Sequence, residues 1–265
     1  MEEVEGARTF GVAGSAYDAY MGRYSTLLAR RFADAAGVEF GQDALDVGCG
    51  PGALTSVLVE RLGAPAVAAC DPSTEFVTDC SARHVGVRVE MGRAESIPFE
   101  TGGFDHVMAQ LVLHFVSEPD RAAGEMMRVA RPGGLVSACV WDFEEGMEML
   151  RGFWDAASEI DPTAPDEART LRFGRPGEIA DLFDSVEMED VAESTLIVSS
   201  TYSSFEELWS GFLAGVGPAG AYCVSLTDGD RVRLRSALFD RFDAPTGSFT
   251  LGAVARCATG RVARR

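Results

Sequence analysis

A short segment near the start of the chain combines an aspartate with several glycines, a set of residues suited to ligand binding. Residues 44–55 read ALDVGCGPGALT, so that Asp46 precedes Gly48, Gly50 and Gly52. Glycines let the backbone approach a ligand without obstruction by side chains. Apolar residues alternate before Gly48 and recur at helical spacing after Gly52, which predicts a strand, a glycine turn and a helix. In an open parallel sheet, such a turn lies at the edge where ligands bind.

The charge of Asp46 separates two classes of nucleotide cofactor. Gly48, Gly50 and Ala53 fit the loose G-x-G-x-x-G/A pattern of NAD-binding turns, but this pattern alone is weak. Asp46 would repel the pyrophosphate of NAD, whereas S-adenosylmethionine (SAM) has no phosphate and carries an ammonium and a sulfonium. We therefore expect SAM. A nucleotide-dependent oxidoreductase and a catalytically silent SAM-binding regulatory protein remain the alternatives.

The segment LDVGCGPGALT resembles motif I of the class I SAM-dependent methyltransferases, in particular the small bacterial enzymes called type 11. With the later motifs, the resemblance is strong from Tyr17 to Asp142. It implies an α/β fold: a Rossmann-like, seven-stranded, mostly parallel sheet with helices on both faces, an antiparallel last strand and a helical N-terminal cap. Within one domain over residues 13–265, the cap would be 13–40, and an insertion at 142–178 would line the acceptor pocket.

Composition limits the partners and the compartment. The 265 residues suit a single domain, and 41 acidic against 23 basic residues give a net charge of −18. This charge disfavours nucleic acids and anionic membranes, so we expect a small-molecule acceptor and a monomer or homodimer. Residues 1–12 are expected to be disordered. The acidic start and the lack of a long apolar run predict a cytoplasmic protein. The six cysteines include no C-x-x-C pair, which predicts buried thiols and no metal site.

The predicted strands and helices place further residues around the turn. The pattern predicts strands at 66–70, 87–91, 135–141, 194–202 and 249–257, and helices at 54–62, 119–130, 147–160, 176–183 and 205–212. Residues 104–116 resemble the family's fourth strand and the loop that follows it. Asp71 follows the strand at 66–70, some twenty residues after the glycine turn, as ribose recognition requires. We therefore expect Asp71 to bind both ribose hydroxyls, although it could instead cap the helix that follows it.

The adenine loop departs from the family pattern. Residues 92–99, GRAESIPF, resemble the family's G-D-A-x-x-L-P-F loop, but Arg93 replaces the aspartate that accepts the adenine amino group. This contact is therefore either lost or moved to Glu95, while we expect the backbone near Ala94 to donate to the ring and Arg93 to stack on it. In the family, an arginine of the cap often meets the SAM carboxylate, and Arg23 matches it; alternatively, Arg23 faces solvent. The implied cofactor-binding residues are Tyr17, Met21, Arg23, Asp46, Gly48, Cys49, Gly50, Asp71, Pro72, Ser73, Arg93, Ala94, Glu95, Gln110 and Leu111.

His114 follows the predicted fourth strand and is the catalytic candidate. A histidine has an ordinary pKa near 6.5, so His114 could act as a general base; alternatively, it only packs beneath the crevice. The aromatic residues of the cap and of the insertion suggest an apolar or aromatic acceptor. The expected walls of the acceptor pocket are Tyr20, His114, Trp141 and Trp154. The resemblance implies in-line transfer of a methyl group to an N, O or C atom, with S-adenosylhomocysteine as the product.

Overall fold

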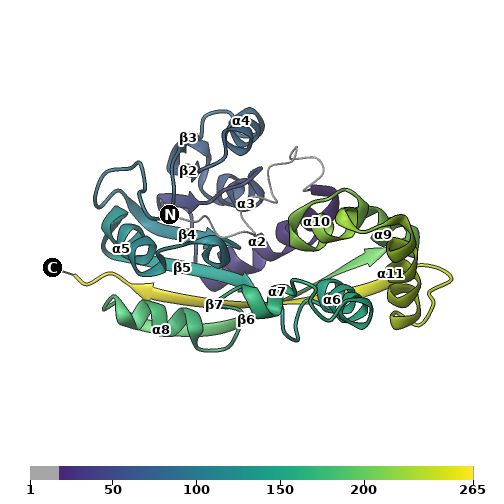
Figure 1. The fold of residues 1–265 in the computed structure, drawn as a ribbon. Helices are drawn as coiled ribbons and strands as arrows, with labels where there is room; N and C mark the ends of the chain where they lie inside the picture. The colour runs from purple at the N-terminus through teal and green to yellow at the C-terminus, as the bar shows by residue number, and fades with distance from the viewer. Residues whose placement is uncertain (1–17, 265) are drawn as a thin grey trace.

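The computed structural model describes residues 18–264, and the strands in this range form one seven-stranded sheet flanked by helices (Figure 1). The order across the sheet is β3-β2-β1-β4-β5-β7-β6. The strands are β1 (Ala44–Val47), β2 (Val67–Asp71), β3 (Arg88–Met91), β4 (Phe104–Gln110), β5 (Ala130–Trp141), β6 (Glu189–Tyr202) and β7 (Phe249–Arg261). Strands β1 to β5 pair in parallel, and β7 is antiparallel to both β5 and β6. The predicted fold class is confirmed.

Helices fill most of the connections between the strands. They are the π-helix η2 (Asp18–Gly22), the 3-10 helices η3 (Ala64–Ala66) and η4 (Leu113–Phe115), and α2 (Arg23–Ala35), α3 (Ala53–Leu62), α4 (Thr74–Arg83), α5 (Pro119–Val129), α6 (Glu148–Ile160), α7 (Glu167–Thr170), α8 (Glu178–Ser185), α9 (Phe205–Leu213), α10 (Gly217–Ser225) and α11 (Asp228–Arg241). The predictions for residues 1–12 and Tyr17, and the first part of the predicted cap, lie outside the described residues.

Strand β1 shows how the sheet separates two cores. All of its residues are buried, and successive side chains of a strand point to opposite faces. Ala44 joins a core cluster with Leu28 of α2 and Leu58 of α3. Leu45 joins a second cluster, to which α5 and α8 contribute. Helices α2 and α3 therefore cover one face of the sheet, and α5 and α8 cover the other.

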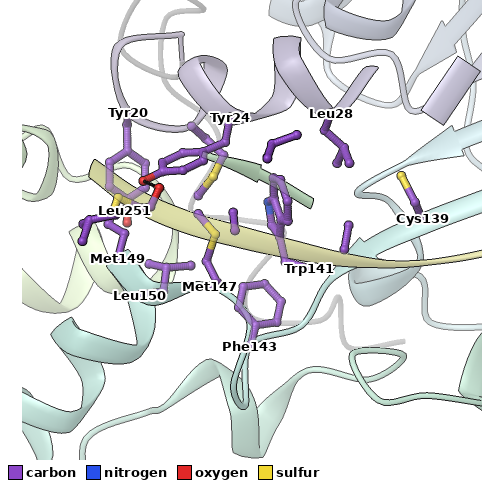
Figure 2. Close-up of a cluster of buried hydrophobic side chains, with 14 of the residues drawn as sticks. Tyr20, Tyr24, Leu28, Cys139, Trp141, Phe143, Met147, Met149, Leu150 and Leu251 are labelled. Atoms are coloured by element: carbon purple, nitrogen blue, oxygen red, sulfur yellow. Dashed lines mark hydrogen bonds between the residues drawn. The ribbon is translucent and has the colours of Figure 1, made fainter. Parts of the chain in front are cut away.

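A layer of helices extends the first core at one end of the sheet. Figure 1 shows α6, α9, α10 and α11 gathered at one end of the sheet, where α11 packs on α6 and α10 packs on α9. Figure 2 shows Tyr20, Tyr24 and Leu28 pointing from the cap toward Trp141 and Leu251. The cap is thus anchored on strands β5 and β7. No helix within residues 18–264 has the length and apolarity needed to span a membrane.

Several predicted element boundaries are corrected by the structure. Strand β5 begins at Ala130 instead of Leu135, because an irregularity in its pairing with β4 accommodates the Arg-Pro-Gly-Gly segment. Strand β6 begins at Glu189, although its first residues are mostly exposed and polar, because backbone pairing with β7 holds this edge strand. Helices α10 and α11 were not predicted. In α11, only Leu234 and Leu238 are buried, so its sequence carries little helical periodicity.

Candidate functional site

A cavity of about 500 Å³ opens at the carboxyl ends of β1, β2 and β4. This volume lies within the range of small-molecule sites, and the position is the ligand edge of a parallel sheet. The predicted cofactor residues that line it are Met21, Asp46, Gly48, Cys49, Gly50, Asp71, Pro72, Ser73, Arg93, Ala94, Glu95, Gln110 and Leu111. Segments distant in sequence therefore converge on one site.

The glycine turn has a backbone shape that few other residues could adopt. Gly48 and Gly50 have positive φ angles of 71° and 52°, in the left-handed region. A Cβ atom on Gly48 would lie 2.5 Å from the Val112 side chain. A Cβ on Gly50 would meet no atom within 4 Å, because that position faces open space. The turn thus packs closely at Gly48 and leaves room for a ligand at Gly50.

Asp46 is a buried carboxyl group at the base of the cavity. Its Oδ2 accepts a hydrogen bond of 2.6 Å from the hydroxyl of Thr55. Burial raises the pKa of Asp46 to about 7, and the nearby charge of Asp71 adds to this increase, while the Thr55 bond opposes it. A cationic ligand beside Asp46 would favour the ionised form.

Asp71 is positioned by backbone donors of two loops. Its Oδ2 accepts from the Gly50 N–H and its Oδ1 from the Ser73 N–H, both at 2.9 Å. Ser73, and not Asp71, caps α4, because the Ser73 hydroxyl accepts from the Phe76 N–H. Burial raises the pKa of Asp71, and the two backbone bonds oppose this. Each carboxylate oxygen retains a lone pair, so Asp71 could still accept from two hydroxyl groups.

The loop expected to bind adenine lies along one wall. Arg93 and Ala94 line the cavity, and Arg93 pairs with Ser96 in an isolated β-bridge. Glu95 Oε1 accepts from the backbone and the hydroxyl of Ser117, each at 3.2 Å. Its Oε2 has no hydrogen bond with any described residue. Glu95 can therefore offer an acceptor atom, as the expected replacement for the missing aspartate requires.

The end of β4 carries local backbone strain. Leu111 has a φ of 62°, which is unfavourable for a residue with a side chain. Its N–H donates to the carbonyl of Cys139 at 2.8 Å. Gln110 Nε2 donates to the Ser25 carbonyl, but its buried Oε1 has no partner among the described residues. Strained residues and unpaired polar atoms are typical of functional sites.

His114 also lines the cavity, from η4. Its Nδ1 is 3.1 Å from the carbonyl oxygen of Arg172. Because a carbonyl can only accept, Nδ1 carries the proton and Nε2 is left as an acceptor. Nε2 is buried and has no partner within residues 18–264. Burial lowers the pKa of His114 to about 4, which corrects the expectation of a pKa near neutrality. At pH 7, His114 is a neutral hydrogen-bond acceptor.

Aromatic side chains surround this end of the cavity. Trp141 and Phe143 line it, and the ring centroids of Phe143 and His114 are 4.9 Å apart. Tyr24 packs edge-on against Trp141. The indole N–H of Trp141 is buried without an acceptor in the described part of the chain. Two residues of the cavity wall, Trp141 and His114, thus carry a buried donor and a buried acceptor without a partner in the described part of the chain.

Arg23 does not line the cavity, which corrects its expected contact with the SAM carboxylate. Its guanidinium donates to Glu207 of α9 and lies 4.0 Å from the centroid of the Tyr202 ring. Glu207 also accepts from the backbone and the hydroxyl of Ser203; these bonds and Arg23 lower its pKa to about 2. Arg23 therefore fastens the cap to α9.

Tyr20 and Trp154 are corrected as well, because both belong to the core and not to the cavity wall. Tyr20 packs edge-on against Phe212, and Figure 2 shows its ring beside Leu251. Trp154 is buried and donates to Glu167. Sequence reasoning overlooked Glu167, which follows a proline-containing break and carries no local signal of burial, yet lines the cavity.

Replacing Arg23 with alanine should leave the affinity for SAM within about twofold of the wild-type value, since Arg23 does not reach the cavity. The free energy of unfolding should fall by about 1–2 kcal/mol, because the ion pair with Glu207 and the contact with the Tyr202 ring are lost. Calorimetric titration and urea unfolding measure the two effects. Arg30→Ala removes an exposed ion pair with Glu60 and serves as a control expected to cost less than about 1 kcal/mol. A tenfold loss of SAM affinity in Arg23→Ala would restore the original expectation.

Comparison with known proteins agrees with this arrangement. A family model described as "Methyltransferase domain" matches residues 45–138. The chain is 32% identical over 130 residues to the malonyl-[acyl-carrier protein] O-methyltransferase of Erwinia billingiae, an alignment that covers 49% of this chain and 51% of that enzyme. It is 33% identical over 148 residues to an uncharacterized protein of Mycobacterium tuberculosis, covering 54% of this chain and 49% of that protein. The chain thus spans about half the length of these relatives.

Solved structures share the complete architecture. A structure from Anaeromyxobacter dehalogenans, described as a type II methyltransferase, aligns with a TM-score of 0.63 and 20% identity over 91% of this chain and 97% of that one. One described as a methyltransferase from an antibiotic biosynthesis pathway of Anabaena variabilis aligns with a TM-score of 0.63 and 16% identity over 87% and 96%. The fold is that of the class I SAM-dependent methyltransferases. Within this fold, the match to the family model is limited to residues 45–138.

Proposed function

We propose that the protein transfers a methyl group from SAM to a small acceptor bound at the aromatic end of the cavity. The observation that carries this proposal is the convergence of the glycine turn with two buried carboxyl groups, Asp46 and Asp71, on one cavity. NAD would bring a pyrophosphate beside Asp46, which its carboxyl group would repel. SAM brings two cationic groups that suit Asp46 and a ribose that suits Asp71.

The residues of the cavity suit SAM in kind as well as in charge. Gly50 leaves open space beside the turn, and Asp71 retains lone pairs for ribose hydroxyls. The loop with Ala94 and Glu95 would hold the adenine, Glu95 through the free Oε2 that was described above. When bound, SAM supplies a methyl group already activated by its sulfonium.

At the acceptor end, the chain would orient the acceptor and exclude water. Trp141 can donate and His114 can accept a hydrogen bond, so together they would hold a polar group of the acceptor inside apolar walls. Such fixed geometry contributes to catalysis without a strong base, because the methyl donor is already activated. We infer an acceptor with an apolar or aromatic body. The low basicity of His114 supports a role in orienting the nucleophile more than in removing its proton.

Titration calorimetry with SAM, S-adenosylhomocysteine and NAD tests the cofactor. We expect SAM and S-adenosylhomocysteine to bind, and NAD not to bind. Transfer of label from methyl-labelled SAM to a small-molecule cell extract then tests the reaction. Tight binding of NAD alone would contradict the proposal. Binding of SAM without labelled products from the extract would instead favour the silent regulatory protein.

A further inference from the structure

Glu167 carries a buried carboxyl group on the cavity wall, and it has no role in the reaction proposed above. Glu167 is only 3% exposed, and it lines the same cavity as Asp46 and His114. Its Oε2 accepts from the indole N–H of Trp154 at 2.8 Å. Glu167 forms no ion pair with any residue between 18 and 264. A buried carboxylate with only one neutral donor is costly, so a cationic partner would stabilise its ionised form.

The position of Glu167 is fixed from helix α6. Arg151 and Trp154 lie one turn apart, on the same face of that helix. Arg151 binds both oxygens of Asp166, and Asp166 caps α7 by accepting from the Ala168 N–H. Trp154 holds Glu167 itself. Asp166 and Glu167 are therefore anchored to two residues on one face of α6, so that the carboxyl group is held in place before any ligand binds.

The surroundings of Glu167 select the type of partner. The cavity has aromatic walls at His114, Phe115, Trp141 and Phe143. Aromatic faces attract cations, and they attract them more strongly where water is excluded. Arg151, the nearest guanidinium on the anchoring helix, already binds Asp155 and Asp166. A buried acid within an aromatic enclosure suits an organic cation, whereas a carboxylate or phosphate would be repelled.

We propose that Glu167 binds the methyl acceptor through a protonated amine, held between its carboxylate and the aromatic walls. This inference rests on the proposed function, because it assigns the acceptor class of the same site. Glu167 is then a specificity-determining residue: it selects amines over neutral and anionic molecules of the same shape. A hydrogen bond to a charged group contributes about 1.5–3 kcal/mol, which corresponds to about 10–100-fold in affinity.

Binding of an ammonium should also release a proton. Burial raises the pKa of Glu167 to about 7, the charge of Asp166 adds to this, and the Trp154 bond opposes it. The buried Tyr20 hydroxyl, whose own pKa Glu167 helps to raise, stays neutral near pH 7. An ammonium ligand favours the ionised carboxylate and lowers its pKa, so part of the protein population loses a proton on binding at pH 7. Calorimetry in buffers of different ionisation enthalpy measures this release.

The experiment compares probes of matched shape on the protein saturated with S-adenosylhomocysteine. The probes are 2-phenylethylamine, N-methyl-2-phenylethylamine and 4-phenylbutylamine, each with the alcohol of equal length, and phenylacetate. We expect at least one amine to bind about tenfold more tightly than its alcohol, with proton release, and phenylacetate to bind most weakly. Glu167→Gln keeps an acceptor for Trp154, and should abolish both the preference and the proton release. Glu60→Gln removes the same charge from an exposed site, and should change neither.

The outcomes separate the two levels of the proposal. Failure of S-adenosylhomocysteine to bind would contradict the proposed function itself. Binding of S-adenosylhomocysteine with no amine preferred over its alcohol, or with a preference that survives in Glu167→Gln, would overturn the amine assignment alone. The unfolding transition of Glu167→Gln is measured alongside. If Glu167→Gln is not folded, Trp154→Phe replaces it, because this substitution removes the hydrogen-bond donor to Glu167. Unchanged affinities of the probes for Trp154→Phe would also contradict the amine assignment.

Discussion

Replacing His114 with alanine should lower the rate of methyl transfer by about 100-fold while leaving the affinity for SAM unchanged, since it removes the acceptor that positions the nucleophile. In the wild-type protein, the Arg172 carbonyl fixes the ring so that the buried Nε2 is left as an acceptor without a partner among the described residues. Without the His114 ring, the acceptor molecule can rotate away from the line of attack on the methyl group. Steady-state kinetics with the acceptor identified from labelled extracts measures the rate, and calorimetry measures SAM binding.

His114→Gln provides the matched control. The side-chain oxygen of glutamine can accept a hydrogen bond, so this variant should recover about tenfold of the lost rate if His114 orients the nucleophile. No recovery, with the variant folded, would favour proton transfer over positioning. Full activity in the alanine variant would exclude both roles. The ¹⁵N NMR spectrum of the wild-type ring should show the Nδ1–H tautomer at neutral pH.

The buried state of His114 also affects stability in acid. Its folded-state pKa of about 4 lies below its ordinary value near 6.5. Between these values, the unfolded chain binds a proton at this position that the folded chain does not. The free energy of unfolding should therefore fall as the pH drops through this window, and by less in His114→Gln. Urea unfolding at several pH values between 4 and 7 measures the difference.

Replacing Asp71 with alanine should weaken SAM binding by about 10–100-fold, because charge-assisted hydrogen bonds to the ribose are lost together with the anchor for the Gly50 N–H. Calorimetric titration measures the affinity. Asp71→Asn keeps one oxygen acceptor but loses the charge, so its affinity for SAM should lie between those of the wild-type protein and Asp71→Ala. Unchanged affinity in a folded alanine variant would exclude Asp71 as the ribose ligand.

The part of the cavity beside the glycine turn could be predicted because its residues occupy one continuous local pattern. The turn from Asp46 to Gly50 joins a strand to a helix, and the geometry of that junction depends on the residues within it. Asp71 ends the neighbouring parallel strand β2, so its place beside the turn follows from topology alone. Local sequence therefore determined which residues would meet there.

The acceptor end could not be predicted to the same degree, because its side chains come from segments whose packing is decided over long distances. Arg23 has Glu207 as its partner, and nothing near Arg23 in the sequence indicates it. Trp154 is an aromatic residue in an amphipathic helix, so a wall and a core position look alike in sequence. Glu167 looks like a surface acid until α6 supplies the indole that binds it.

The position of β7 has a consequence for the order in which the fold can assemble. β7 lies between β5 and β6, so residues 249–261 must arrive before β5 acquires its second neighbour. During synthesis, β5 is complete well before β7 emerges, and its edge then offers unpaired N–H and C=O groups to any other strand. Contacts this distant in sequence also slow folding. Aggregation during expression should therefore arise before release from the ribosome, and chaperones that shield strand edges should increase the yield.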